Sequence, residues 1–183
     1  MDVLDQTLEK LAQSAVPVLP HEVFEKIRTD GTIEERGKLY DFYLTFGESA
    51  FGSTQQSSLH GEDFTVKYLA DCLAIPSGHG EHMGCYEAGW EITRLLGHAL
   101  RQQRLSFAGS LLRMVDNAFC SGNAEQRICI ENAFLEHPIE DSVAAPFVSS
   151  QNVSAELHAA IRSAATERSN RAISSPLARQ SPD

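Results

Sequence analysis

Residues 79–85 read HGEHMGC and hold the residue types with the greatest capacity for chemistry in this chain. His79, His82 and Cys85 lie three residues apart, so one helical turn would bring them to the same face. Imidazole nitrogen and thiolate sulfur are ligands that Zn²⁺ prefers in proteins. A zinc site used by a metal-dependent or hydrolytic enzyme is therefore one hypothesis for this segment.

Two features of the neighbouring sequence weigh against a zinc site. Gly78, Gly80 and Gly84 disfavour the regular helix that would stack the three ligands. No spacing singles out a fourth ligand among the remaining candidates, which are His60, Cys72 and His98. We therefore expect no bound metal and no cofactor, and we interpret the segment as a loop that faces a partner or solvent.

No catalytic residue stands out elsewhere in the sequence. Ser49 lies in the segment GESAF, which lacks the second glycine of the GxSxG turn that exposes a serine nucleophile, and Glu48 is its only charged neighbour. The sequence also has no glycine-rich loop of the kinds that hold nucleotide phosphates. It therefore favours a protein that binds another protein over an enzyme, with a helical adaptor protein as a further alternative.

The negative charge of the chain is concentrated in its first half. The formal net charge is −10. Residues 1–91 contain sixteen Asp or Glu against six Lys or Arg, whereas residues 92–183 contain nine of each. An acidic surface repels the phosphates of nucleic acids and anionic lipids, so we expect neither a nucleic-acid nor a membrane partner. Its natural complement is a basic protein, although an acidic surface can also serve solubility alone.

Trp90, the only tryptophan, is flanked by Glu87 and Glu91 at the expected start of a helix. An exposed tryptophan at this place could anchor a partner. Packing in a core or at its edge is the commoner role of tryptophan, and we favour it here on that ground. The residues that we predict to contact a partner are Glu62, Asp63, Asp71, Glu81, Glu87, Trp90 and Glu91.

Helical periodicity runs through the chain, and no alternation of apolar and polar residues is long enough to require a sheet. We therefore predict an all-α fold, a single-domain helical bundle of about seven to nine helices, over residues 1–168. Residues 169–183 are rich in Ser, Arg and Pro and are expected to form a frayed C-terminal tail.

Capping and breaking residues divide the chain into these helices. In the first half, helices are predicted over residues 2–14, over 21–31, and from the capping box of Thr32 with Glu35 to Gly47, with a loop over 47–61. In the second half, Asn123 and Ser154 are expected to cap helices. The apolar residues expected to line the inner faces of these helices are Leu4, Leu8, Leu11, Leu39, Phe42, Tyr43, Phe46, Phe64, Tyr68, Leu69, Cys72, Leu73, Ile92, Leu95, Leu96, Ala99, Leu100, Ala108, Leu111, Leu112, Val115, Phe119, Ile130, Ala133, Phe134, Leu157, Ala160, Ile161 and Ala164.

The cellular compartment is predicted from the absence of membrane-spanning, secretory and disulfide patterns in the sequence. No window approaches eighteen consecutive apolar residues, and the N-terminus carries Asp2, Asp5 and Glu9 where a secretory signal needs a basic start. The four cysteines form no CxxC pair and no dense framework. We therefore predict a cytoplasmic protein whose cysteines are reduced.

The helices expected over residues 83–138 share a pattern of apolar positions around a short polar turn. Its elements are Phe107, Leu111, Leu112, Val115, the turn over residues 121–125, Arg127, and the FLE sequence at 134–136. In this pattern the segment resembles the helical core of small bacterial immunity proteins. The resemblance covers about a third of the chain, and most of its residues are helix-packing ones.

Members of this group are encoded beside toxins that bacteria deliver to one another, including type VI secretion effectors and polymorphic toxins, and neutralise them by direct binding. The resemblance therefore implies that the partner is a cognate protein toxin, such as a basic nuclease or another cytoplasmic enzyme. An acidic surface would speed the capture of a basic toxin and mask its active cleft.

Overall fold

The fold is all-α, as the periodicity predicted. The computed structural model describes residues 3–15, 17–47, 50, 55–76, 83–138 and 141–174. Within these ranges there are nine α-helices, α1 to α9, and one π-helix, η2, and no strand. The helices gather into two compact units, residues 1–84 and 85–183, which we describe one at a time. The single domain over residues 1–168 stays a prediction.

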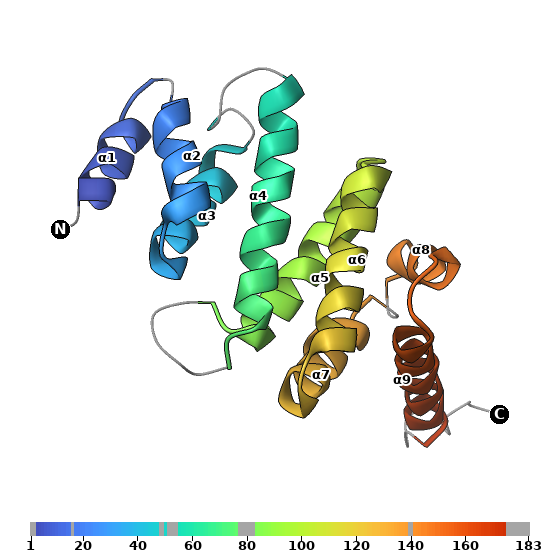
Figure 1. The fold of residues 1–183 in the computed structure, drawn as a ribbon. Helices are drawn as coiled ribbons and strands as arrows, with labels where there is room; N and C mark the ends of the chain where they lie inside the picture. The colour runs from blue at the N-terminus through green and yellow to red at the C-terminus, as the bar shows by residue number, and fades with distance from the viewer. Residues whose placement is uncertain are drawn as a thin grey trace. The chain divides into compact units, whose positions relative to one another are not determined.

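The first unit is built around α3 (Figure 1). Its helices are α1 (Val3–Ala12), α2 (His21–Asp30), α3 (Ile33–Phe46) and α4 (Gln55–Leu73). Helix α3 contacts each of the other three. These bounds agree with the predicted helices, except that α4 begins at Gln55, where a loop was predicted to continue to residue 61. Small polar residues are poor helix formers, but tertiary packing can override such weak preferences.

Aromatic rings fill the core of the first unit. The Phe24 and Phe64 rings meet edge to face with their centroids 5.7 Å apart, and the Tyr40 and Tyr68 rings lie 5.0 Å apart. These pairs join α2 and α3 to α4, and they add to the apolar area that each ring buries. The predicted apolar stripe of α4 is confirmed, because all five of its members are buried: Phe64, Tyr68, Leu69, Cys72 and Leu73.

The second unit is built around α5. Its elements are α5 (Cys85–Arg101), α6 (Leu105–Ser121), α7 (Ala124–Ile130), η2 (Glu131–Leu135), α8 (Ala144–Ser150) and α9 (Ala155–Ser174). Helix α5 contacts α6, α7, η2 and α8, and α9 packs on α6 and η2. Helix α9 runs past Ser169, so the predicted tail is helical as far as Ser174, and residues 175–183 lie outside the described ones.

Side-chain caps start three of the helices where the sequence placed them. Thr32 accepts a hydrogen bond from the Glu35 backbone, and Asn123 accepts one from the Gln126 backbone, each completing a capping box. The Ser154 hydroxyl accepts from the Leu157 backbone at the start of α9. In addition, the Ser154 backbone N–H donates to Oδ2 of Asp116, at 2.9 Å, which ties α9 to α6.

The start of α8 depends on a carboxylate, and this gives a prediction. Asp141 accepts hydrogen bonds from the backbone N–H groups of Val143, at 2.8 Å, and Ala144, at 3.1 Å, and its other oxygen lies 3.4 Å from Arg101. These hydrogen bonds, with help from the Arg101 charge, lower the pKa of Asp141 below its ordinary value. Because the pKa is lower in the folded chain, the ionised group stabilises the fold above the unfolded pKa of about 4, and this contribution is lost as the pH falls further.

We therefore expect Asp141→Ala to cost ~0.5–2 kcal/mol of unfolding free energy at pH 7, and less near pH 2–3. Urea denaturation at the two pH values measures this. Asp141→Asn is the matched control, because its amide oxygen can still accept the two backbone hydrogen bonds. Equal stability of wild type and Asp141→Ala at pH 7 would show that the carboxylate does not support α8.

Candidate functional site

An exposed aromatic surface lies along one side of α5, so the favoured prediction that Trp90 packs in a core or at its edge is wrong as far as the core is concerned. Trp90 is 59% exposed and Tyr86, one helical turn earlier, is 36% exposed. The Trp90 ring centroid is 6.4 Å from that of His137, and the two rings are nearly perpendicular. Asn132 Nδ2 donates to the Tyr86 hydroxyl oxygen at 3.5 Å. We call Tyr86, Trp90, Asn132 and His137 the aromatic face.

The aromatic face is positioned by close packing of α5 on η2. Gly89 is buried next to Trp90, and a Cβ there would come within 2.6 Å of the Cβ of Ala133, so only glycine permits this approach. The backbones of the two elements are therefore close enough to bring Asn132 and His137 beside the α5 aromatics. The π-helix was not predicted, and such segments are frequent at functional sites.

A disulfide between Cys85 and Cys129 joins α5 to α7 beside this surface. It corrects the prediction that all four cysteines are reduced. Both half-cystines are buried, and their Cα atoms lie 6.3 Å apart, within the range of protein disulfides. Cys72 and Cys120 remain free thiols. Because cytosolic thiols are mostly kept reduced, the bond weighs against the predicted cytoplasmic location, which stays a prediction.

The predicted contact residues of α5 differ in how far they are already engaged. Glu91 is mostly buried, and Arg94 donates two hydrogen bonds to its carboxylate, at 2.7 and 2.6 Å. Glu87 is exposed on the same side of the helix as Trp90. Glu87 and Trp90 are therefore more accessible to a partner than Glu91 is.

The other predicted contact residues lie on α4, in the first unit. Asp63 is exposed and Glu62 is half-buried. Asp71 forms an ion pair with Arg36 of α3, so its carboxylate is already engaged between α3 and α4. Glu81 lies outside the described residues. The structure therefore divides the predicted contact residues between two helices in separate units.

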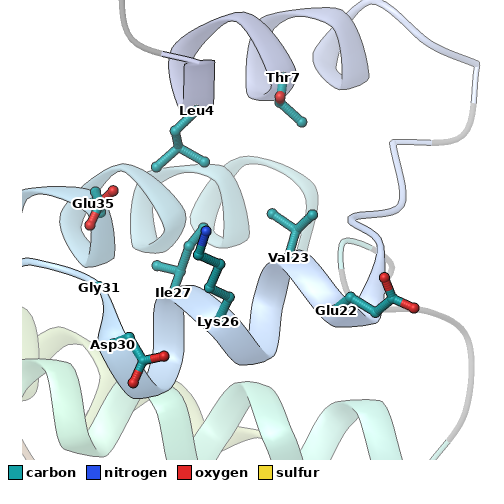
Figure 2. A pocket seen from close by; sticks show the side chains of 9 residues that line it. All are labelled: Leu4, Thr7, Glu22, Val23, Lys26, Ile27, Asp30, Gly31 and Glu35. Carbon is teal, nitrogen blue, oxygen red and sulfur yellow. The ribbon is translucent and has the colours of Figure 1, made fainter.

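The first unit also has a cavity of about 620 Å³, which the sequence did not indicate (Figure 2). Leu4 of α1 points toward Val23 and Ile27 of α2 across it, and Glu22 and Asp30 lie at the two ends of α2. Thr7, Lys26, Gly31 and Glu35 complete the lining. Three apolar side chains and that of Lys26 thus lie toward its middle, and Glu22 and Asp30 lie toward its ends.

No metal centre is assembled among the residues that the structure describes. No group of three or more His, Cys, Asp or Glu there could hold an ion. His79 and His82 lie outside those residues, so the absence of a metal stays a prediction. Cys85, the third ligand of the zinc hypothesis, is bonded to Cys129 and cannot supply a thiolate in that state.

The buried thiol of Cys72 is not a nucleophile at neutral pH. Its burial raises the pKa to about 11, although a hydrogen bond with Tyr68 acts in the opposite direction. Because only the thiolate attacks, a thiol with this pKa is almost wholly unreactive near pH 7.

In the described ranges, no helix combines the length and apolar character that crossing a membrane requires. No family model matches this chain, and neither a curated protein nor a solved structure is significantly similar to it.

Proposed function

We propose that this protein is an immunity protein that binds a co-encoded antibacterial toxin and thereby neutralises it, without catalysing a reaction. The observation that carries this proposal is the exposed Trp90 on the aromatic face. Tryptophan and tyrosine are enriched among the residues that dominate binding energy, and Trp90 and Tyr86 lie one turn apart on a closely packed helix.

The toxin is proposed as the partner because residues 83–138 resemble small immunity proteins, and this segment contains the whole aromatic face. The acidic excess of residues 1–91 supports a basic toxin, such as a nuclease, because opposite charges speed diffusional encounter. We place the neutralisation in the cytoplasm, where such a toxin would act, and this requires the buried Cys85–Cys129 bond to resist the thiols that keep most cytosolic cysteines reduced. A metal-dependent enzyme is less well supported because Cys85 is in a disulfide.

Trp90 provides the most direct test of the proposed function. We expect Trp90→Ala to weaken binding of the toxin encoded by the neighbouring gene by ~10- to 30-fold, because it removes a large ring from the centre of the proposed interface. Isothermal titration with purified toxin measures the affinity, and growth of cells that express the toxin measures protection.

The matched control for Trp90→Ala is Leu105→Ala. Leu105 is also 59% exposed, but it lies at the start of α6 and outside the aromatic face. This variant should bind and protect like the wild type. If the wild-type chain neither binds the toxin nor protects cells, the immunity function is wrong, and a helical adaptor becomes the better hypothesis.

The predicted contact carboxylates give a separate prediction about the rate of association with the toxin. Reversal of all six predicted carboxylates would break the Asp71–Arg36 and Glu91–Arg94 ion pairs, and so would confuse loss of folding with loss of binding. We therefore leave Asp71 and Glu91 unchanged and reverse Glu62→Lys, Asp63→Lys and Glu87→Lys together, with circular dichroism to verify that the variant is folded. We expect slower association with the toxin and a weaker dependence of that rate on salt.

Stopped-flow association at low and high salt measures this effect. The uncharged variant Glu62→Gln, Asp63→Gln, Glu87→Gln is the matched control and should lie between the wild type and the reversed variant. An unchanged association rate in a folded reversed variant would show that the acidic residues do not steer capture, while leaving the Trp90 prediction intact.

A further inference from the structure

We infer that the aromatic face binds an arginine side chain on a basic segment of the partner, with the guanidinium over the Trp90 indole. This inference rests on the proposed function, because it assigns the chemistry of the partner at the same surface. It follows from the exposure of the indole, the charge of the surrounding helices, and the hydrogen-bonding groups at its side.

The indole of Trp90 is available for a planar ligand. Its 59% exposure is far above that of a packed tryptophan, and its nearest aromatic neighbour, His137, is nearly perpendicular to it. The two rings therefore do not stack. The face of an indole carries negative electrostatic potential, so it attracts a cation within about 6 Å of the ring centre.

The charges near Trp90 also favour a cation. The segments 85–94 and 128–137, which contain the aromatic face, carry four carboxylates against one guanidinium, that of Arg94. Arg94 donates two hydrogen bonds to Glu91, at 2.7 and 2.6 Å, so its charge is already paired with that carboxylate. The carboxylates of these segments are Glu87, Glu91, Glu131 and Glu136. An anionic ligand would therefore be repelled, and a basic one attracted.

Arginine suits this surface better than lysine does. Its planar guanidinium stacks on aromatic rings and is more weakly hydrated than an ammonium, and its five N–H groups can reach several acceptors at once. The Tyr86 hydroxyl, the Asn132 amide and the Glu87 carboxylate supply oxygen acceptors on or beside the aromatic face.

Two arginines of the second unit already lie over aromatic rings of the same chain, in cation–π contacts. The Arg104 guanidinium lies 5.3 Å from the centre of the Phe107 ring, and that of Arg127 lies 5.7 Å from the centre of the Phe119 ring. Trp90 is a stronger partner for a cation than phenylalanine is, and no cation–π contact to it is found among the described residues.

The first test uses the wild-type chain and a defined probe. Because Trp90 is the only tryptophan, intrinsic fluorescence reports on this site alone. We expect hexa-arginine to change the Trp90 emission in a saturable way, at lower concentrations than hexa-lysine, whereas hexa-glutamate has no effect. Equal titrations with the two basic peptides, or no response to hexa-arginine, would overturn the inference.

The second test separates a cation from an apolar occupant in the toxin complex. Trp90→Phe keeps an aromatic ring at position 90, whereas Trp90→Leu keeps only an apolar side chain there. We expect Trp90→Phe to bind the toxin ~3- to 30-fold more tightly than Trp90→Leu, the range that a cation–π contact supplies. Equal affinities would overturn the inference. Both variants are checked for an unchanged melting temperature, which their exposed position leads us to expect.

The outcomes also distinguish the inference from the proposed function. If toxin binding needs Trp90 but hexa-arginine has no effect on the Trp90 emission, the immunity function stands and the inference of an arginine ligand is wrong. If hexa-arginine changes the emission but no toxin binds, the arginine site stands and the immunity function is wrong. If the Trp90 emission shifts with protein concentration alone, and sedimentation shows a dimer that Trp90→Ala dissociates, the face is covered by a second copy of the chain and the inference is wrong.

Discussion

Leu111→Ala and Leu112→Ala are each expected to lower the free energy of unfolding by ~2–5 kcal/mol. Leu111 is fully buried and Leu112 is 1% exposed, both on the face of α6 that packs in the second unit. Truncation to alanine removes the transfer free energy of three carbon atoms and leaves a cavity that the surrounding helices fill only in part. A loss of this size is a large share of the 5–15 kcal/mol that stabilises a typical domain.

Urea denaturation followed by circular dichroism measures these losses. Leu105→Ala is the matched control, because it changes the same residue type in the same helix at a position that is 59% exposed. It should alter the unfolding free energy by no more than ~0.5 kcal/mol. If Leu111→Ala and Leu112→Ala behave like this control, the assignment of the α6 core face is wrong.

Loss of the Cys85–Cys129 disulfide is expected to destabilise the protein by roughly 4 kcal/mol at 25 °C. The two half-cystines are separated by 44 residues, and a bond across that length restricts the unfolded chain. The chain-entropy relation gives this magnitude, because a closed loop removes conformations from the unfolded state. The double variant Cys85→Ser, Cys129→Ser should therefore unfold at a lower urea concentration than the oxidised wild type.

Reduction provides the internal check on this prediction. Dithiothreitol should shift the unfolding of the wild type toward that of the double variant and leave the double variant unchanged. Cys120→Ser is the control for loss of a cysteine outside the bond, since Cys120 is an exposed free thiol. Thiol titration of the unfolded, unreduced protein should find two groups, Cys72 and Cys120; four groups would show that the bond does not form.

The starts of α3 and α7 could be predicted from the sequence because their caps depend on residues close together in the chain. Thr32 and Glu35 are three residues apart, as are Asn123 and Gln126, and helix geometry alone brings such side chains to the backbone groups that they cap. The same locality explains why the apolar stripe of α6 identified Leu111 and Leu112 as core residues.

Contacts between distant residues could not be predicted in this way. Asp116 meets Ser154 across 38 residues, and Cys85 meets Cys129 across 44, so each pairing depends on the path of the chain between them. Neither pair has a spacing that distinguishes it from the alternatives. For the cysteines, a single bond among the four of them can be formed in six ways.

At the candidate site, too, part of the answer was local and part was not. The residue type and helical position of Trp90 identified it as either a core residue or an anchor, but whether its side chain is buried depends on which elements cover that side of α5. The close approach of Gly89 to Ala133 places η2 beside Trp90 without covering it. Sequence therefore determined the all-α fold class, the capped starts of α3, α7 and α9, and the apolar stripes of α4 and α6, because these follow from local geometry. Tertiary structure decided which side chains remain exposed, because exposure depends on neighbours that the chain brings from far away.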